Sequence, residues 1–120
     1  MVSLTNPSSP DDEAAFNQWF DEVHVPEVSR LSGVAAVRRF TAVAQMLPPA
    51  AAPTYQYAAL YELDDVDLAT ASLESAAPVF RLSDAADLAG ALGFVFRERR
   101  VIELDRPFGQ SRNESEGKAK

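Results

Sequence analysis

Two strand-like segments around a proline-rich loop constrain the fold of this chain most. Residues 34–43 (VAAVRRFTAV) and 54–63 (TYQYAALYEL) are rich in β-branched and aromatic residues, which favour extended backbone. The loop between them, residues 44–53, holds three prolines and shows no repeating pattern. We therefore predict two strands of an antiparallel sheet, joined by a loop without regular structure.

A helical pattern precedes this pair of strands. Phe16, Phe20 and His24 are spaced four apart, so they form one apolar stripe on a helix that starts just after a pair of aspartates. Pro26 removes a backbone donor and disfavours helical backbone at the residue before it, so we expect the helix to stop or kink near residue 25. A second short helical segment then starts at Pro26 and ends at Gly33.

The remaining segments complete the pattern. Residues 1–5 alternate apolar and polar side chains and indicate a short first strand; either the native start lies upstream or this strand is a stub. The pair Asp64-Asp65 caps a second helix over residues 65–77. Residues 83–92 indicate a short helix, and residues 94–104 a last strand.

The predicted elements follow one another in the order β-α-β-β-α-β. This order is typical of a ferredoxin-like α+β domain, in which a four-stranded antiparallel sheet carries its helices on one face. Apolar residues occupy both alternations of the later strands, so the face of the sheet without helices must also be covered. A second copy of the chain would bury that face, and we therefore predict a homodimer.

Composition limits the partners of the protein. The chain has 120 residues, which suits one domain; we assign the domain to residues 1–107 and expect a disordered polar tail over residues 108–120. The formal net charge of -7 argues against nucleic acid and against an anionic membrane surface. Without a basic-then-apolar start segment or a spanning apolar stretch, the expected location is cytoplasmic.

His24, the only histidine, is the first candidate for chemistry. Imidazole is the side chain best suited to move protons near neutral pH, and the apolar stripe would aim it at the sheet. The plainer interpretation is a core histidine that donates to a backbone carbonyl freed near Pro26. Tyr57 and Tyr61 share one side of a predicted strand and could hold a substrate oxygen, although tyrosine also simply packs sheets.

A second set of candidates would bind an apolar substrate. Arg38 and Arg39 point to opposite faces of their strand, so one of them should point inward, where Glu62, Glu98 or a substrate carboxylate could pair with it. Aromatic side chains could line a pocket, or they could simply form core. The predicted substrate-binding residues are Trp19, Phe20, Arg38, Phe40, Phe94 and Phe96.

The sequence offers little for a cofactor. With no cysteine in the chain, disulfides, thiolate catalysis and cysteine-held metals are excluded. One histidine near Asp21, Glu22 and Glu27 lacks the ligand spacing of a zinc or iron site. The chain also has neither a glycine-rich phosphate loop nor a G-x-S-x-G nucleophile motif. We therefore expect no metal and no cofactor.

The stretch NPSSPDDEAAFNQWFDEVHVPEVSRLSGVAAVRRF resembles the dimeric α+β barrel proteins, in particular the EthD-like branch. The resemblance rests on Phe16, Trp19 or Phe20, His24, Pro26 and Gly33, which match a helix of the form F-x-x-W/Y-x-x-x-H-x-P before a small residue and a strand. YAALYEL and RLSDAADL are also similar to that group. The resemblance spans roughly residues 1–105 and implies a homodimer, but it leaves the reaction open.

Together these observations favour a cofactor-independent enzyme acting on an aromatic or polyketide-like substrate. It would be of the cyclase, isomerase or monooxygenase type, with His24 as the proton-transfer group and a small apolar organic ligand. One alternative is a non-catalytic ligand-binding or accessory dimer of a catabolic or biosynthetic pathway. Another is a haem-handling protein of the same fold, with His24 as the candidate ligand.

Overall fold

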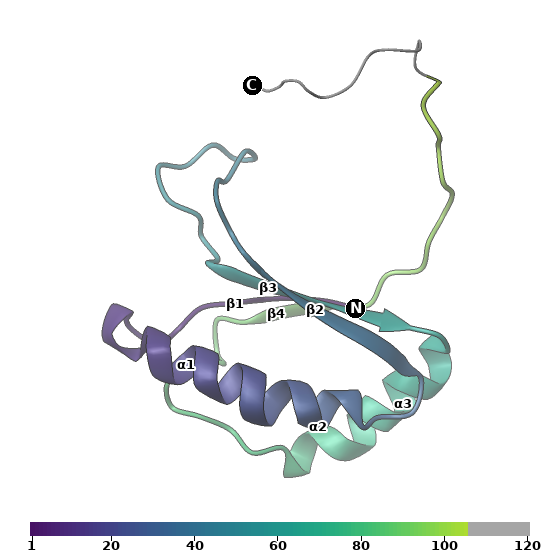
Figure 1. Ribbon diagram of the computed structural model, residues 1–120, viewed down its shortest axis with the longest axis horizontal. Coiled ribbons are helices and arrows are strands. Elements are labelled where there is room, and N and C mark those ends of the chain that lie inside the picture. The colour runs from purple at the N-terminus through teal and green to yellow at the C-terminus, as the bar shows by residue number, and fades with distance from the viewer. Residues whose placement is uncertain (106–120) are drawn as a thin grey trace.

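The computed structural model describes residues 1–105 of the chain. The predicted tail, residues 108–120, lies outside the described residues, as do the last two residues of the predicted domain. The strands are β1 (Val2–Thr5), β2 (Val34–Thr41), β3 (Tyr57–Leu63) and β4 (Leu92–Phe94), and the helices are α1 (Glu13–Trp19), α2 (Val25–Ser29) and α3 (Val66–Ala76). Figure 1 shows the three helices on one side of the sheet, while the loop after β2 and the chain after β4 lie on the other side.

The four strands form one sheet in the order β2-β3-β1-β4, and every neighbouring pair is antiparallel. The α+β class and the predicted four-stranded antiparallel sheet are therefore confirmed. The central strand β3 alternates buried and partly exposed residues, because Tyr57, Ala59 and Tyr61 face the helices. Leu60 and Ala58 face the other way, onto the side without helices, which we call the open face.

The first helical segment runs from residue 10 to residue 29 without stopping at the proline. A 3-10 turn (Pro10–Asp12) leads into α1, a π-helical turn (Phe20–His24) follows, and α2 continues directly from it. The N–H of Val25 bonds to the carbonyl of Phe20, five residues back. This wider turn accommodates Pro26, which cannot donate to a carbonyl four residues back and lies in the first turn of α2. The predicted stop or kink is thus a π-turn.

Helix α3 begins and ends near the positions predicted for the helix over residues 65–77. The side chain of Asp65 caps α3 by accepting a hydrogen bond from the backbone N–H of Leu68 at 2.9 Å. Pro78 lies in a 3-10 turn directly after the helix. Gly33 precedes β2 with φ of 87° and accepts a hydrogen bond from the N–H of Asp64, so it connects the start of β2 to the turn that caps α3.

Two predictions about the last third of the chain are wrong in detail. No helix forms over residues 83–92: Leu92 begins β4, and the residues before it form turns and an isolated bridge from Ala86 to Pro7. Their backbone bonds to the segment after β1, because Ser8 N–H donates to the carbonyl of Ala85 and Asp87 N–H donates to the carbonyl of Asn6. The last strand ends at Phe94, far short of residue 104. Phe94 pairs with Val2, the first residue of β1, so the chain beyond it has no further strand residue to pair with.

The core lies between the helices and the sheet. Its fully buried side chains include Phe16 and Phe20 from the first helical segment, Val28 from α2 and Tyr61 from β3. Phe16 and Phe20 pack with their ring centroids 5.6 Å apart. The predicted apolar stripe of the helix therefore faces the sheet, which is the arrangement that its spacing of four residues requires.

Candidate functional site

A cavity of about 230 Å³ lies between the first helical segment and the β1–β4 side of the sheet. Phe16, Trp19, Phe20 and His24 form the helix wall, and Ser3 and Thr5 of β1 form part of the sheet wall. The segment 82–93 closes the remaining side. A cavity of about 150 Å³ holds benzene in another protein, so this one has room for a molecule of one or two rings. A hollow between α2 and α3 admits only about 10 Å³.

His24 lines this cavity within a cluster of aromatic rings. Its imidazole stacks on Trp19 with the centroids 5.0 Å apart and meets the rings of Phe20 and Phe80 edge-on at 4.9 Å and 5.9 Å. Nδ1 is buried and forms no hydrogen bond with any described residue. The expected donation to a carbonyl near Pro26 is therefore not made through this nitrogen.

Burial keeps the imidazole of His24 neutral. Loss of water contact lowers its pKa below the ordinary value of 6.5; Glu27 raises the pKa in part, and Arg39 lowers it further. At neutral pH the ring is consequently an unprotonated base. A neutral imidazole in an apolar cavity can accept a proton from a bound molecule and return it.

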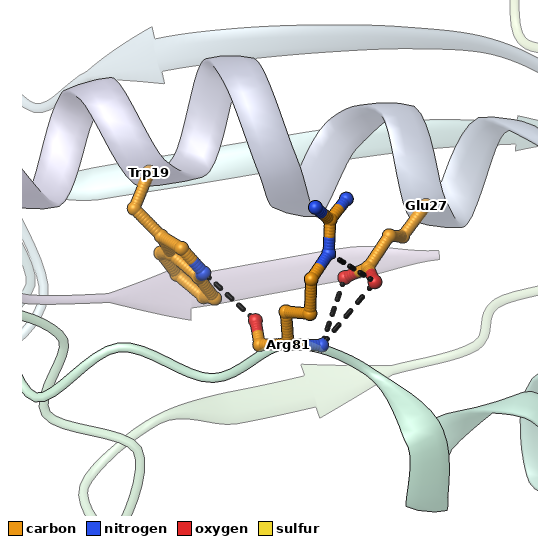
Figure 2. A network of polar contacts seen from close by, with 3 residues as sticks. All are labelled: Trp19, Glu27 and Arg81. Atoms are coloured by element: carbon orange, nitrogen blue, oxygen red, sulfur yellow. Dashed lines mark hydrogen bonds and ion pairs between the residues drawn. The ribbon is translucent and has the colours of Figure 1, made fainter.

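Figure 2 shows how the wall opposite the helix is attached to it. Trp19 Nε1 donates to the carbonyl oxygen of Arg81 at 2.8 Å. The carboxylate of Glu27 accepts from both the backbone N–H and Nε of Arg81 at 3.2 Å. These bonds hold the chain at residue 81 against the end of α1 and against α2. They thereby place Phe80 against His24 and Leu82 at the cavity.

The two predicted tyrosines lie near the cavity but are not among its lining residues. The hydroxyl of Tyr57 donates to the Glu13 carboxylate and accepts from Asn17 Nδ2 at 3.1 Å, so this phenol is already bonded. Tyr61 is buried, and burial raises its pKa to about 12. Its hydroxyl lies beside Ser3 Oγ, yet the two form no hydrogen bond of standard geometry. Their predicted catalytic role stays a prediction.

Arg39, not Arg38, is the arginine that faces the helices. Its guanidinium lies 4.2 Å from the ring centroid of Phe20, and Nη1 pairs with Asp21 at 2.9 Å. The expected partner Glu62 instead pairs with Arg38 at 3.6 Å on the open face, where both side chains are well exposed. Arg39 thus closes the aromatic core from the β2 side, and Arg38 lies away from the cavity.

The predicted substrate-binding residues therefore separate into two groups. Trp19 and Phe20 line the cavity with His24. Phe40 and Phe94 lie on the open face, where their sheet partners are Ala58 and Val2. Phe96 follows the last strand and packs on Phe94 with the ring centroids 6.0 Å apart. These phenylalanines are partly exposed and belong to a different surface from His24.

Sequence reasoning missed the sheet wall of the cavity. Ser3 and Thr5 are two residues apart on the helix-facing side of β1, and their hydroxyls are buried without a hydrogen bond to any described residue. The alternation of residues 1–5 would have placed the two hydroxyls on one face. Serine and threonine are common residues, however, so the sequence does not mark Ser3 and Thr5 as site residues. Only their burial at the cavity wall does.

Comparison with protein-family models, with curated proteins and with solved structures finds no match for this chain. Among the residues that the structure describes, no group of three or more histidine and acidic side chains is placed to hold a metal ion. Within the same range, every helix is too short or too polar to cross a lipid bilayer. The site is thus characterised by its own residues.

Proposed function

We propose that this protein is a cofactor-independent enzyme that moves a proton on a small aromatic or polyketide-like molecule bound beside His24. The observation that carries the proposal is the buried, unbonded Nδ1 of a neutral imidazole in an apolar cavity of about 230 Å³. Apolar walls with one base and a few polar groups suit a flat molecule with one polar oxygen. The proposed ligand is therefore a small apolar organic molecule, and His24 is its proposed proton-transfer group.

The simplest chemistry at such a base is proton removal next to a carbonyl. The imidazole takes the proton, the C–H electron pair forms a carbon–carbon double bond, and the carbonyl electron pair moves onto oxygen to give an enolate. Return of the proton to another carbon completes an isomerisation. Attack of the enolate carbon on a second carbonyl closes a ring, and the imidazolium then protonates that carbonyl's oxygen. General base catalysis of this kind contributes about 10²–10⁴-fold.

We further infer that the fold is ferredoxin-like and that two copies pair as an EthD-like dimeric α+β barrel. The sheet order β2-β3-β1-β4 with the helices on one side supports the first inference. The apolar open face supports the second, because Leu92 and Phe94 remain exposed there in a single chain. In this arrangement the open face forms the dimer contact, while the cavity on the helix side stays within each subunit.

Deuterium exchange into 2-tetralone tests the proposed reaction, since this two-ring ketone has acidic protons beside its carbonyl. In D₂O at pH 7 the wild-type protein should speed exchange, as followed by mass spectrometry. His24→Gln should lose that acceleration by about 10²-fold or more while still binding 2-tetralone. Asp87→Asn is the matched control, because it alters the other titratable side chain among the lining residues and should leave exchange intact.

The outcomes separate the rival functions. If the wild-type protein binds 2-tetralone without accelerating exchange, the non-catalytic ligand-binding protein becomes the better description. If Asp87→Asn loses exchange and His24→Gln keeps it, the base has been assigned to the wrong side chain. If the wild-type protein binds no cyclic ketone of this size, the ligand site itself is wrong.

A further inference from the structure

The helix-facing side of β1 carries two buried hydroxyls, those of Ser3 and Thr5, at the wall of the cavity. Ser3 pairs with Ala59 on β3 and with Gly93 on β4, so its immediate neighbours across the sheet are small. A Cβ atom built at Gly93 meets nothing within 4 Å. Ser3 and Gly93 both line the cavity, so the sheet wall has open space at Gly93, beside the serine.

Among the described residues, neither hydroxyl of this wall forms a hydrogen bond of standard geometry, although the hydroxyl of Tyr61 lies beside Ser3 Oγ. Ser3 Oγ and Thr5 Oγ1 are buried and form no hydrogen bond with any described residue. Leaving a buried polar group unbonded is costly, so a purely structural position would favour alanine or valine. The pair is better suited to a bond with a molecule that enters the cavity.

We propose that Ser3 and Thr5 bind the carbonyl oxygen of the ligand, which assigns the substrate to the cyclic ketones and their enols. This inference rests on the proposed function of the cavity and names the groups that hold the substrate. His24 lies on the helix wall and the two hydroxyls lie on the sheet wall, so a flat ligand between them meets a base on one side and donors on the other.

The chemistry of the donors matches the enolate step. A hydroxyl can donate one hydrogen bond while it accepts others, and donors fixed in an apolar site stabilise an oxygen on which negative charge develops. The predicted oxygen-holding tyrosines are less suitable: Tyr57 is already bonded to Glu13 and Asn17, and Tyr61 lies beside Ser3 but outside the lining of the cavity.

Paired ligands test the assignment. The probes are 2-tetralone and tetralin, which share the two-ring skeleton but differ in the carbonyl oxygen. Ser3→Ala and Thr5→Val should each weaken binding of 2-tetralone by about threefold to tenfold, the usual effect of one hydrogen bond, and should leave tetralin binding unchanged. Thr41→Val, a threonine of the same sheet that lies outside the cavity, should change neither.

Two further measurements complete the test: ligand binding by a variant whose cavity is filled, and thermal unfolding of the ligand-free variants. Gly93→Val should block both probes, because its side chain would enter the open space beside Ser3. Thermal unfolding of ligand-free Ser3→Ala and Thr5→Val should be unchanged or shifted upward, since each substitution removes an unsatisfied group. A hydroxyl with a purely structural role would instead lower the unfolding temperature.

The possible failures can be told apart. If Gly93→Val blocks both probes but Ser3→Ala and Thr5→Val bind 2-tetralone like the wild type, the oxygen-binding assignment is wrong and the cavity stands. If the two variants lose tetralin binding to the same degree, they act through packing and the assignment is also overturned. If the wild-type protein binds neither probe, the proposed function fails together with this inference.

Discussion

His24 is the residue on which the proposed chemistry of this protein depends. It lies in the π-turn of the first helical segment, between the rings of Trp19, Phe20 and Phe80. These rings exclude water and lower the pKa of the imidazole, while the carboxylate of Glu27 works in the opposite direction. A base that is neutral at pH 7 and unbonded at Nδ1 is what proton transfer in an apolar cavity needs.

The lowered pKa of His24 predicts a pH dependence of stability. Between the lowered folded pKa and the unfolded value of about 6.5, the unfolded chain binds more protons than the folded one, so stability falls as the pH drops below about 6.5. Urea unfolding from pH 7.5 to pH 5 should show this loss. His24→Gln should make the curve flatter than that of the wild type. Two parallel curves would contradict the assigned pKa direction.

At the scale of elements, two local features position the cavity walls. The π-turn lets the helix continue past Pro26, so one helical segment carries Phe16, Phe20 and also Glu27, which binds Arg81. Gly33 lets the chain turn from α2 into β2 beside the cap of α3. Both features depend on backbone geometry that a generic sequence would not adopt.

Gly33→Ala should destabilise the protein by on the order of 1–3 kcal/mol. The residue has φ of 87°, and an added Cβ would lie 2.7 Å from the carbonyl oxygen of Asp65 and 2.8 Å from the backbone nitrogen of Ala69. Gly93→Ala is the matched control, because an added Cβ there meets nothing within 4 Å. Urea unfolding of the two variants measures the difference; equal stabilities would show that the turn at residue 33 relaxes freely.

At the scale of the whole molecule, the sheet has two different faces. The helices cover one face (Figure 1), and the core and the cavity lie on that side. The strand register places Phe40, Leu92 and Phe94 on the open face, where their side chains are exposed. An apolar sheet face of this kind is normally covered by another layer. The described part of the chain supplies no such layer, so a second copy of the protein is the partner that we propose.

Two substitutions at equally exposed residues test the proposed homodimer, because only one of the residues lies on the open face. Phe94 on the open face is 48% exposed, and Leu68 on α3 is 47% exposed. The wild-type protein should sediment with twice the mass of the 13.0 kDa chain. Phe94→Glu should convert it to a monomer, because a carboxylate would be buried in the contact. Leu68→Glu should leave the dimer intact. A wild-type monomer at micromolar concentration would contradict the proposal.

Local sequence patterns were sufficient for the strands around the central loop, the capped helix after β3 and the apolar stripe of the first helix. Each depends on neighbouring residues: alternation for a strand, spacing of four for a helix, and Asp65 for a cap. The same stripe placed His24 toward the sheet. What these patterns determined is therefore the class of the fold, the helices and strands just named, and one candidate base.

Only the tertiary structure decided the rest, because the deciding partners are distant in sequence. The predicted helix over residues 83–92 does not form, because the backbone of Ala85 and Asp87 bonds to Ser8 and Asn6 in the segment after β1, distant in sequence. The last strand is short because β1 begins at Val2, which pairs with Phe94. Arg39 rather than Arg38 turned inward because the pairing of β2 with β3 set which residues face the helices. The open space beside Ser3 and Thr5 exists only where β1, β4 and the helix meet, and no short stretch of sequence contains that information.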